Sequence, residues 1–129
     1  MTPTILTLLT AVVLVQGRWQ QVGLTSTGNP VFVDSRTVKT AKDGIISATV
    51  RVTYTKPVAI PGKGDVTGSK AAAMFNCTAN SFAVKESWIF HDEKTNKIYQ
   101  HKVNKIPGYG PTLAGSFGDV AFKHFCKKA

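Results

Sequence analysis

Residues 45–56 show the clearest alternation of apolar and polar side chains in the chain. The apolar positions fall on one side of an extended strand and are Ile46, Ala48, Val50, Val52 and Tyr54. The residues between them are Ser, Thr or Arg. Strict alternation over this length predicts a half-buried strand of an antiparallel sheet, with one face packed and the other solvated.

Shorter runs with strand-like composition predict the rest of a sheet. The further strands are expected at residues 19–24, 31–34, 70–78, 81–91 and 98–103. Residues 25–30 form the turn of a first hairpin, and turns are also expected near residue 44 and at 92–97. The Pro- and Gly-rich segments 57–69 and 104–111 are expected to be loops.

The last segment changes from strand to helix periodicity. Its apolar stripe consists of Gly118, Ala121, Phe122, Phe125 and Cys126. Such a stripe indicates an amphipathic helix, with Ser116 as its N-cap and Asp119 in a capping-box-like position. The predicted fold class is therefore α+β: an antiparallel sheet of about six strands packed by one C-terminal helix.

The first seventeen residues differ from the rest of the chain. They carry no charged side chain, and residues 5–15 are apolar except for two Thr. This stretch is too short to span a bilayer, which takes about 20 residues. It fits a signal peptide, so we expect residues 1–17 to be removed before Arg18 and residues 18–129 to form one domain. A buried N-terminal strand or an uncleaved anchor are the alternatives; no Cys follows the stretch, so no lipid anchor is expected there.

Two cysteines, Cys77 and Cys126, predict one disulfide in an exported protein. The bond would tie the helix to the strand that carries Cys77. It would close a loop of about 50 residues, which the chain-entropy model values at about 4 kcal/mol. No C-x-x-C motif points to redox chemistry, and two cysteines do not complete a structural zinc site.

A search for catalytic motifs is mostly negative, and no catalytic residue, metal site or cofactor is predicted. The sequence around Ser116 is not a nucleophile elbow, and residues 62–70 lack the spacing of a phosphate-binding loop. The three His show no metal-ligand spacing. Glu86 shares strand parity with apolar residues, which indicates a strand end, an edge or a bulge more often than a buried functional acid. A pair of Glu86 with His91 is the arrangement that a small basic hydrolase would need.

The chain is basic. Sixteen Lys and Arg face seven Asp and Glu, a formal net charge of +9. Such a chain is drawn to anionic partners, or it carries the charge for solubility alone. We expect an acidic protein partner rather than nucleic acid, and the candidate binding surface consists of Arg51, Lys63 and Lys70. The mature chain is predicted to have no transmembrane segment.

The order of landmarks resembles the bacterial surface-adhesin protein E family. The landmarks are Trp19, Val22-Gly23, Gly28, the strand 31–35, the long strand ending at residues 54–57, Asn76-Cys77, the aromatic strand ending at Asp92, Gly115-Ser116 and Cys126. The resemblance covers nearly the whole mature chain. It implies an antiparallel sheet with a C-terminal helix joined by the same kind of disulfide.

The resemblance also implies a function. The family's named member is an outer-membrane lipoprotein adhesin that binds host matrix and serum proteins, dimerises and binds haem, and many relatives are small exported proteins. For this chain it implies a periplasmic or secreted protein, associated with the outer membrane in some cases and able to form a homodimer. Two features depart from the adhesin: the lipoprotein cysteine is missing, and the basic residues before Asn76, Lys63 and Lys70, are separated rather than adjacent.

Three hypotheses follow. The first is an exported, non-enzymatic binding module for an acidic protein, with the polar strand face and the segment 63–70 as surfaces. The second is a structural accessory of a periplasmic or cell-envelope assembly. The third is a small basic hydrolase that uses His91 and Glu86.

Overall fold

A computed structural model describes residues 18–127, so the predicted signal peptide at 1–17 lies outside the described residues. The elements are β1 (Trp19–Leu24), β2 (Pro30–Asp34), the 3₁₀ turn η1 (Ser35–Thr37), β3 (Lys39–Thr40), β4 (Ile46–Ile60), β5 (Gly64–Asn76), β6 (Ser81–Asp92), β7 (Lys97–Val103) and helix α2 (Phe117–Phe125). The strands form one sheet in the order β1-β2-β4-β5-β6-β7, and β3 pairs with β4. All pairings are antiparallel. The predicted fold class is confirmed; the seventh strand is the two-residue β3, too short to give a sequence signal.

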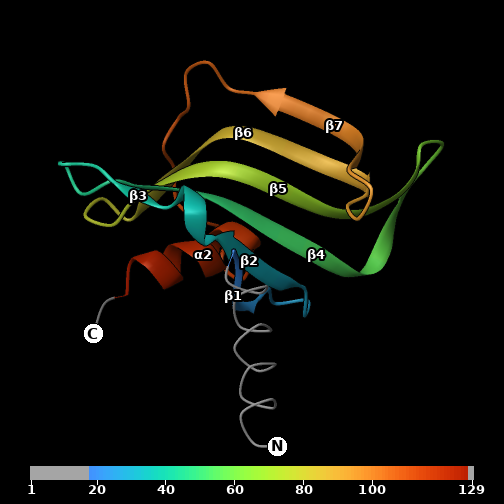
Figure 1. Ribbon diagram of the computed structural model, residues 1–129, viewed down its shortest axis with the longest axis horizontal. Coiled ribbons are helices and arrows are strands. Elements are labelled where there is room, and N and C mark those ends of the chain that lie inside the picture. The colour runs from blue at the N-terminus through green and yellow to red at the C-terminus, as the bar shows by residue number, and fades with distance from the viewer. Residues whose placement is uncertain (1–17, 128–129) are drawn as a thin grey trace, which may run out of the picture.

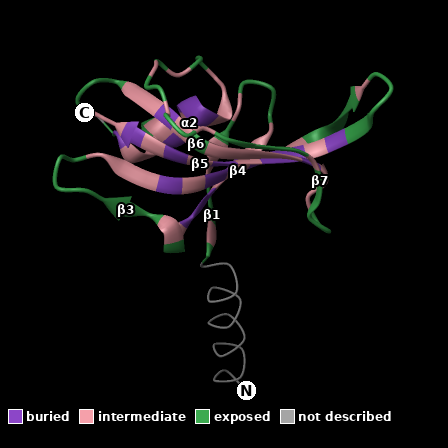
Figure 2. Cartoon of the chain, turned by 90° about the horizontal axis from the view of Figure 1, so that it is seen from above, coloured by how far each residue is buried: buried purple, intermediate pink, exposed green. Residues whose placement is uncertain are grey.

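The segment predicted as a loop at 57–69 is mostly strand, so that prediction was wrong. Strands β4 and β5 continue as a two-stranded hairpin that projects from the body of the sheet and has a largely exposed tip (Figure 2). Pro57 lies where the β4–β5 register shifts, between Thr53 and Val58, so its missing N–H breaks no ladder. Gly62, with φ 73°, and Gly64, with φ 91°, form the tight turn.

Helix α2 covers one face of the sheet, against β1, β2 and β4 (Figure 1). The core between them is built from β-strand residues that alternate with solvent-facing ones, together with the apolar stripe of the helix. Its buried members are Val31, Val33, Ala48, Val50, Val52, Ala73, Phe75, Ala121 and Cys126. The alternation read in residues 45–56 therefore identified the packed face correctly. None of the helices within residues 18–127 has the length and apolar character needed to cross a bilayer.

A bulge in β6 sorts its residues between the two faces. Ala73 pairs with Val84, but the next residue, Ala72, pairs with Glu86, so Lys85 is an extra residue. Paired residues point to the same side of a sheet, and the bulge reverses the parity of β6. Glu86 therefore lies on the face away from α2, whereas Val84 lies on the helix side. Of the meanings proposed for the parity of Glu86, the structure shows the bulge.

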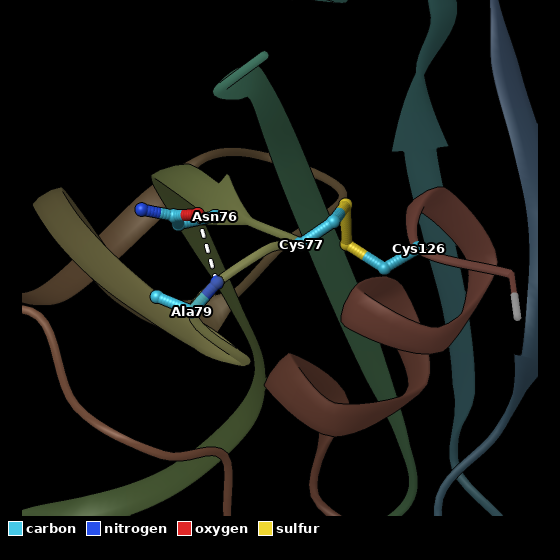
Figure 3. The surroundings of a disulfide bond; sticks show 4 residues. All are labelled: Asn76, Cys77, Ala79 and Cys126. Carbon is cyan, nitrogen blue, oxygen red and sulfur yellow. Dashed lines mark hydrogen bonds between the residues drawn. A yellow bond between two sulfur atoms is a disulfide. The ribbon is translucent and has the colours of Figure 1, made fainter. Parts of the chain in front are cut away.

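The disulfide Cys77–Cys126 is present and joins the end of β5 to the C-cap of α2 (Figure 3). The two Cα atoms are 5.2 Å apart, within the usual range for disulfides. Asn76 stabilises the turn after β5, because its side-chain oxygen accepts a hydrogen bond from the backbone N–H of Ala79 (3.1 Å). The bond thus holds the helix against the strand that carries the core residue Phe75.

Ser116 is the N-cap of the helix, as predicted, and its side chain accepts a hydrogen bond from the Asp119 N–H (3.2 Å). The buried Asp119 carboxylate accepts from the Gly115 N–H (3.0 Å) and from the Thr112 hydroxyl (2.8 Å). The hydrogen bond from Gly115 is the main cause that lowers the pKa of Asp119 below its usual 3.8, followed, against the cost of burial, by Thr112 and Lys123. One side chain therefore fixes both the loop before the helix and its first turn.

Acid should destabilise the fold in two windows. Burial and, to a lesser extent, Lys127 lower the pKa of His124 below 6.5. Both His124 and Asp119 have a lower pKa in the folded chain than in the unfolded chain, so the unfolded chain takes up the proton at a higher pH. The contribution of each group to the free energy of unfolding is therefore complete above its unfolded pKa and is lost as the pH falls through its folded pKa. We expect the loss from His124 to begin below 6.5 and the loss from Asp119 below 3.8.

The measurement is urea unfolding at a series of pH values for the wild type and for Asp119→Asn. At neutral pH the variant should lose about 1–3 kcal/mol, since buried donors lose a charged acceptor. The wild-type advantage should then shrink as pH falls below 3.8. A difference that does not depend on pH would show that the charge of Asp119 is not what stabilises the loop.

Candidate binding surface

One row of paired residues crosses the whole sheet on the face away from α2. From β1 to β7 the row consists of Gln21, Phe32, Arg51, Lys70, Trp88 and His101, each in direct register with the next. Their sequence neighbours Val31, Val33, Val50 and Ala71 are buried on the helix side. Since successive side chains of a strand alternate, the row faces outward. We call it the basic–aromatic row.

Arg51 lies against two aromatic rings, both from strands on the same side of β4. Its guanidinium carbon is 4.5 Å from the centre of the Trp19 ring and 5.1 Å from that of Phe32. Cations placed over aromatic rings in this way are attracted by the ring quadrupole. The rings therefore hold the guanidinium in one position at the surface of the sheet.

Lys70 begins a second stack on the neighbouring strands. Its ammonium is 4.4 Å from the centre of the Trp88 ring. Trp88 is in turn stacked on His101, with ring centres 5.2 Å apart and an interplanar angle of 8°. His101 Nε2 contacts Glu86 Oε2 at 2.5 Å. Along the row, the two cations Arg51 and Lys70 are therefore adjacent, with aromatic rings on either side of the pair.

A hollow of about 250 Å³ opens between the two stacks. It is lined by Arg18, Trp19, Arg51, Lys70, Phe90, Glu93 and Asn96. Glu93 reaches this hollow from the turn after β6, where its backbone N–H donates to the Thr67 hydroxyl (3.0 Å). Gly68 gives the carboxylate room, because a Cβ there would lie 2.8 Å from Glu93 Oε2 and 2.7 Å from the backbone oxygen of Val52.

A second, more open hollow lies beside β3 and has a volume of about 380 Å³. Its basic lining residues are Arg36, Lys39 and Lys85, and its floor is made of the small residues Ser47, Thr49 and Ala72. Among residues 18–127, no Asp or Glu lines this hollow. Lys85 reaches this hollow as the extra residue of the β6 bulge. Positive charge therefore extends along the outer face beyond the row.

The structure brings together two of the three predicted binding residues. Arg51 and Lys70 are direct cross-strand partners. Lys63 lies at the tip of the long hairpin, where it lines a separate hollow with Asp65 and His91. The hairpin that replaces the predicted loop at 57–69 places Lys63 at its tip, away from Lys70.

Sequence reasoning missed Trp19, Trp88, His101 and Glu93 as members of this surface. Each is ordinary on its own, and only the register across the strands makes them neighbours of Arg51 and Lys70. The chain's two Trp residues were a usable signal, since both belong to the surface. Glu93, in a turn, gave none.

The acid–base pair proposed for a hydrolase is not the pair that the structure shows. Glu86 contacts His101, whereas His91 Nδ1 contacts the backbone oxygen of Asp65 at 2.7 Å. Within residues 18–127, no group of three or more His, Cys, Asp or Glu side chains is placed to hold a metal ion.

The fold and this surface define a class of protein: a small sheet domain closed by one disulfide, with a helix on one face and an open basic, aromatic face on the other. The chain belongs to the surface-adhesin protein E family, whose model matches residues 19–127. No curated protein and no solved structure gives a significant match to the chain. The family and the disulfide together indicate an extracytoplasmic location, because disulfides persist in oxidising compartments.

Proposed function

We propose that the protein is an exported, non-enzymatic binding module whose basic–aromatic row binds an acidic protein in the periplasm or outside the cell. The observation that carries the proposal is the row itself, in which Arg51 and Lys70 are paired in register and are each held against an aromatic ring. Membership of an adhesin family supports a binding role.

The positive charge of this face, and the fixed positions of its charged side chains, both favour binding there. The row and the hollow beside β3 together present five Lys and Arg, with Arg18 at the rim. Arg18 is partly neutralised by the buried Asp34, which its Nε contacts at 3.2 Å. A cation already held over a ring loses less conformational freedom on binding than a free side chain does, and lost freedom is a main cost of association. An acidic partner therefore meets charges that are already in position.

The aromatic rings of this face should also contribute to the free energy of binding. Trp, Tyr and Arg are the residues that most often dominate the energetics of protein interfaces. Trp19 and Trp88 lie next to the two cations of the row and are only half-buried. A partner that covers the row would bury apolar ring surface and neutralise charge at the same place.

The test is the affinity of the purified, disulfide-bonded protein for a fluorescently labelled peptide with four consecutive Glu, measured by anisotropy. We expect binding that weakens steeply between about 0.01 M and about 1 M salt, since the screening length falls from about 30 Å to about 3 Å. Lys70→Gln should weaken binding about fivefold or more, as expected when one close charge pair is lost.

Lys63→Gln is the matched control, because it removes the same charge from the hairpin tip. It should change the affinity by less than about twofold, as expected for an exposed charge away from the contact. Binding that is insensitive to salt, or equal losses from both variants, would contradict the proposal. Failure of the wild type to bind the peptide at low salt would favour the envelope-accessory role instead.

A further inference from the structure

Arg51 is poorly satisfied for a side chain so well enclosed. Its side chain is only 29% exposed and lies within 5.1 Å of the ring centres of Trp19 and Phe32. The guanidinium has five N–H donors. The buried Nε has no hydrogen-bond partner, and the structure shows no hydrogen bond from this side chain to another residue of the described chain. Aromatic rings hold the cation in place without using its donors.

Glu93 faces Arg51 and is unsatisfied in the same way. Its side chain is 13% exposed, and its Oε2 is buried without a hydrogen-bond partner among residues 18–127. Oε2 lies 3.8 Å from Arg51 Nε, close enough for charge attraction but too far for a hydrogen bond. An unmet buried polar group is costly, so the pair is an incomplete interaction.

The hollow beside this pair has the size and charge for one more acid. Arg18, Arg51 and Lys70 line it against the single carboxylate of Glu93. Its volume of about 250 Å³ is below the ~300–1,000 Å³ of typical small-molecule pockets. It is more enclosed than the hollow beside β3. Space and charge together therefore fit a single acidic side chain rather than a larger ligand.

We propose that this hollow is the pocket for one Asp or Glu carboxylate of the protein partner, and that Glu93 is a built-in competitor for it. This inference rests on the proposed function and specifies its central contact. The incoming carboxylate accepts hydrogen bonds from the Arg51 guanidinium and lies beside the ammonium of Lys70. Glu93, on a turn rather than a strand, is the group that yields as the partner's acid enters.

Substitutions of Arg51 and Glu93 should change the affinity for an acidic peptide in opposite directions. Arg51→Gln removes the donors that meet the incoming acid, so it should weaken binding about tenfold or more, in line with hydrogen bonds to charged groups. Glu93→Gln keeps the shape of the side chain and removes the negative charge next to the incoming acid. It should strengthen binding about fivefold, the size of a like-charge repulsion at about 4 Å near water.

Intrinsic fluorescence gives a direct readout, because the chain's two Trp residues, Trp19 and Trp88, both lie at this surface. The purified, disulfide-bonded protein is titrated at low salt with the unlabelled peptide of four Glu, and with the same peptide containing Gln as the control ligand. Wild type, Arg51→Gln, Glu93→Gln and Lys63→Gln are compared. A sulfated oligosaccharide of equal charge is a third ligand.

Weaker binding by Arg51→Gln together with tighter binding by Glu93→Gln supports the pocket. Weaker binding by Glu93→Gln overturns the competitor role, since it shows that Glu93 positions Arg51. Equal effects of Arg51→Gln and Lys63→Gln overturn the pocket, and so does tighter binding of the sulfated sugar than of the Glu peptide. If the wild type does not bind the Glu peptide at all, it is the proposed function that fails.

Discussion

Replacing both Cys77 and Cys126 with Ser is expected to lower the free energy of unfolding by about 4 kcal/mol. The bond joins residues 49 positions apart, so its loss frees a long segment of the unfolded chain. That segment includes β6, β7 and the whole of α2. A domain of this size has a total stability of about 5–15 kcal/mol, so the variant should remain folded only marginally.

Unfolding of the double Ser variant and of the wild type in guanidinium chloride measures this difference in the free energy of unfolding. The wild type treated with a reducing agent is the matched control, because it lacks the bond but keeps both sulfur atoms. It should unfold at nearly the same denaturant concentration as the variant. An unchanged midpoint in both samples would show that packing alone, without the bond, holds α2 to the sheet.

The core and the helix were predictable because their signals are local. Alternation in residues 45–56 identifies the buried positions of β4 without knowledge of any other strand. The stripe of α2, with Ser116 at its start, is read from eleven consecutive residues. The disulfide pairing was predictable from the number of cysteines, since two cysteines allow only one pairing. The alternation and the stripe depend only on neighbours in sequence, and the pairing of the two cysteines depends only on their number.

The outer surface was less predictable because it depends on register. Arg51 and Lys70 are nineteen positions apart in sequence, and they meet because the β4–β5 hairpin is long and turns tightly at Gly62. Pro57 and the glycines around it indicated a loop instead. The irregular stretch after Thr53 admits the Pro while the strands separate and pair again. A composition rule cannot anticipate such a register shift.

The β6 bulge is a second source of the difference. Strict alternation assigns Glu86, Trp88 and Val84 to one face. The extra residue Lys85 divides them, and it moves Trp88 to the outer face, where it meets Lys70. The bulge therefore gives one strand an apolar side that faces the helix and an aromatic side on the outer face. The bulge also explains why Glu86 shares strand parity with apolar residues in the sequence.

Phe75→Ala is expected to lower the free energy of unfolding by about 3–5 kcal/mol, as is typical of a large aromatic side chain lost from a core. Phe75 is 0% exposed. Its ring centre is 5.1 Å from that of Phe125 and 6.4 Å from that of Phe122, both on α2, and 6.2 Å from that of Phe82 on β6. It therefore joins the helix to the sheet, two residues from the disulfide.

Urea unfolding measures the loss, with Ile106→Ala as the control. Ile106 is 92% exposed, so its truncation should change stability by less than about 0.5 kcal/mol. If Phe75→Ala does not fold, Phe75→Leu replaces it, with an expected loss of about 1 kcal/mol. Equal stability of the Phe75 and Ile106 variants would contradict the placement of Phe75 in the core.

Phe75→Leu also tests whether packing on the helix side of the sheet affects binding on the outer face. Phe75 and Lys70 lie on one strand, but Phe75 points to α2 and Lys70 to the basic–aromatic row. Phe75→Leu should therefore leave the affinity for the acidic peptide unchanged to within about twofold, as expected for sites that share no contact. A larger loss would show that the row depends on the packing beneath it. In that case the helix face would tune binding as well as stability.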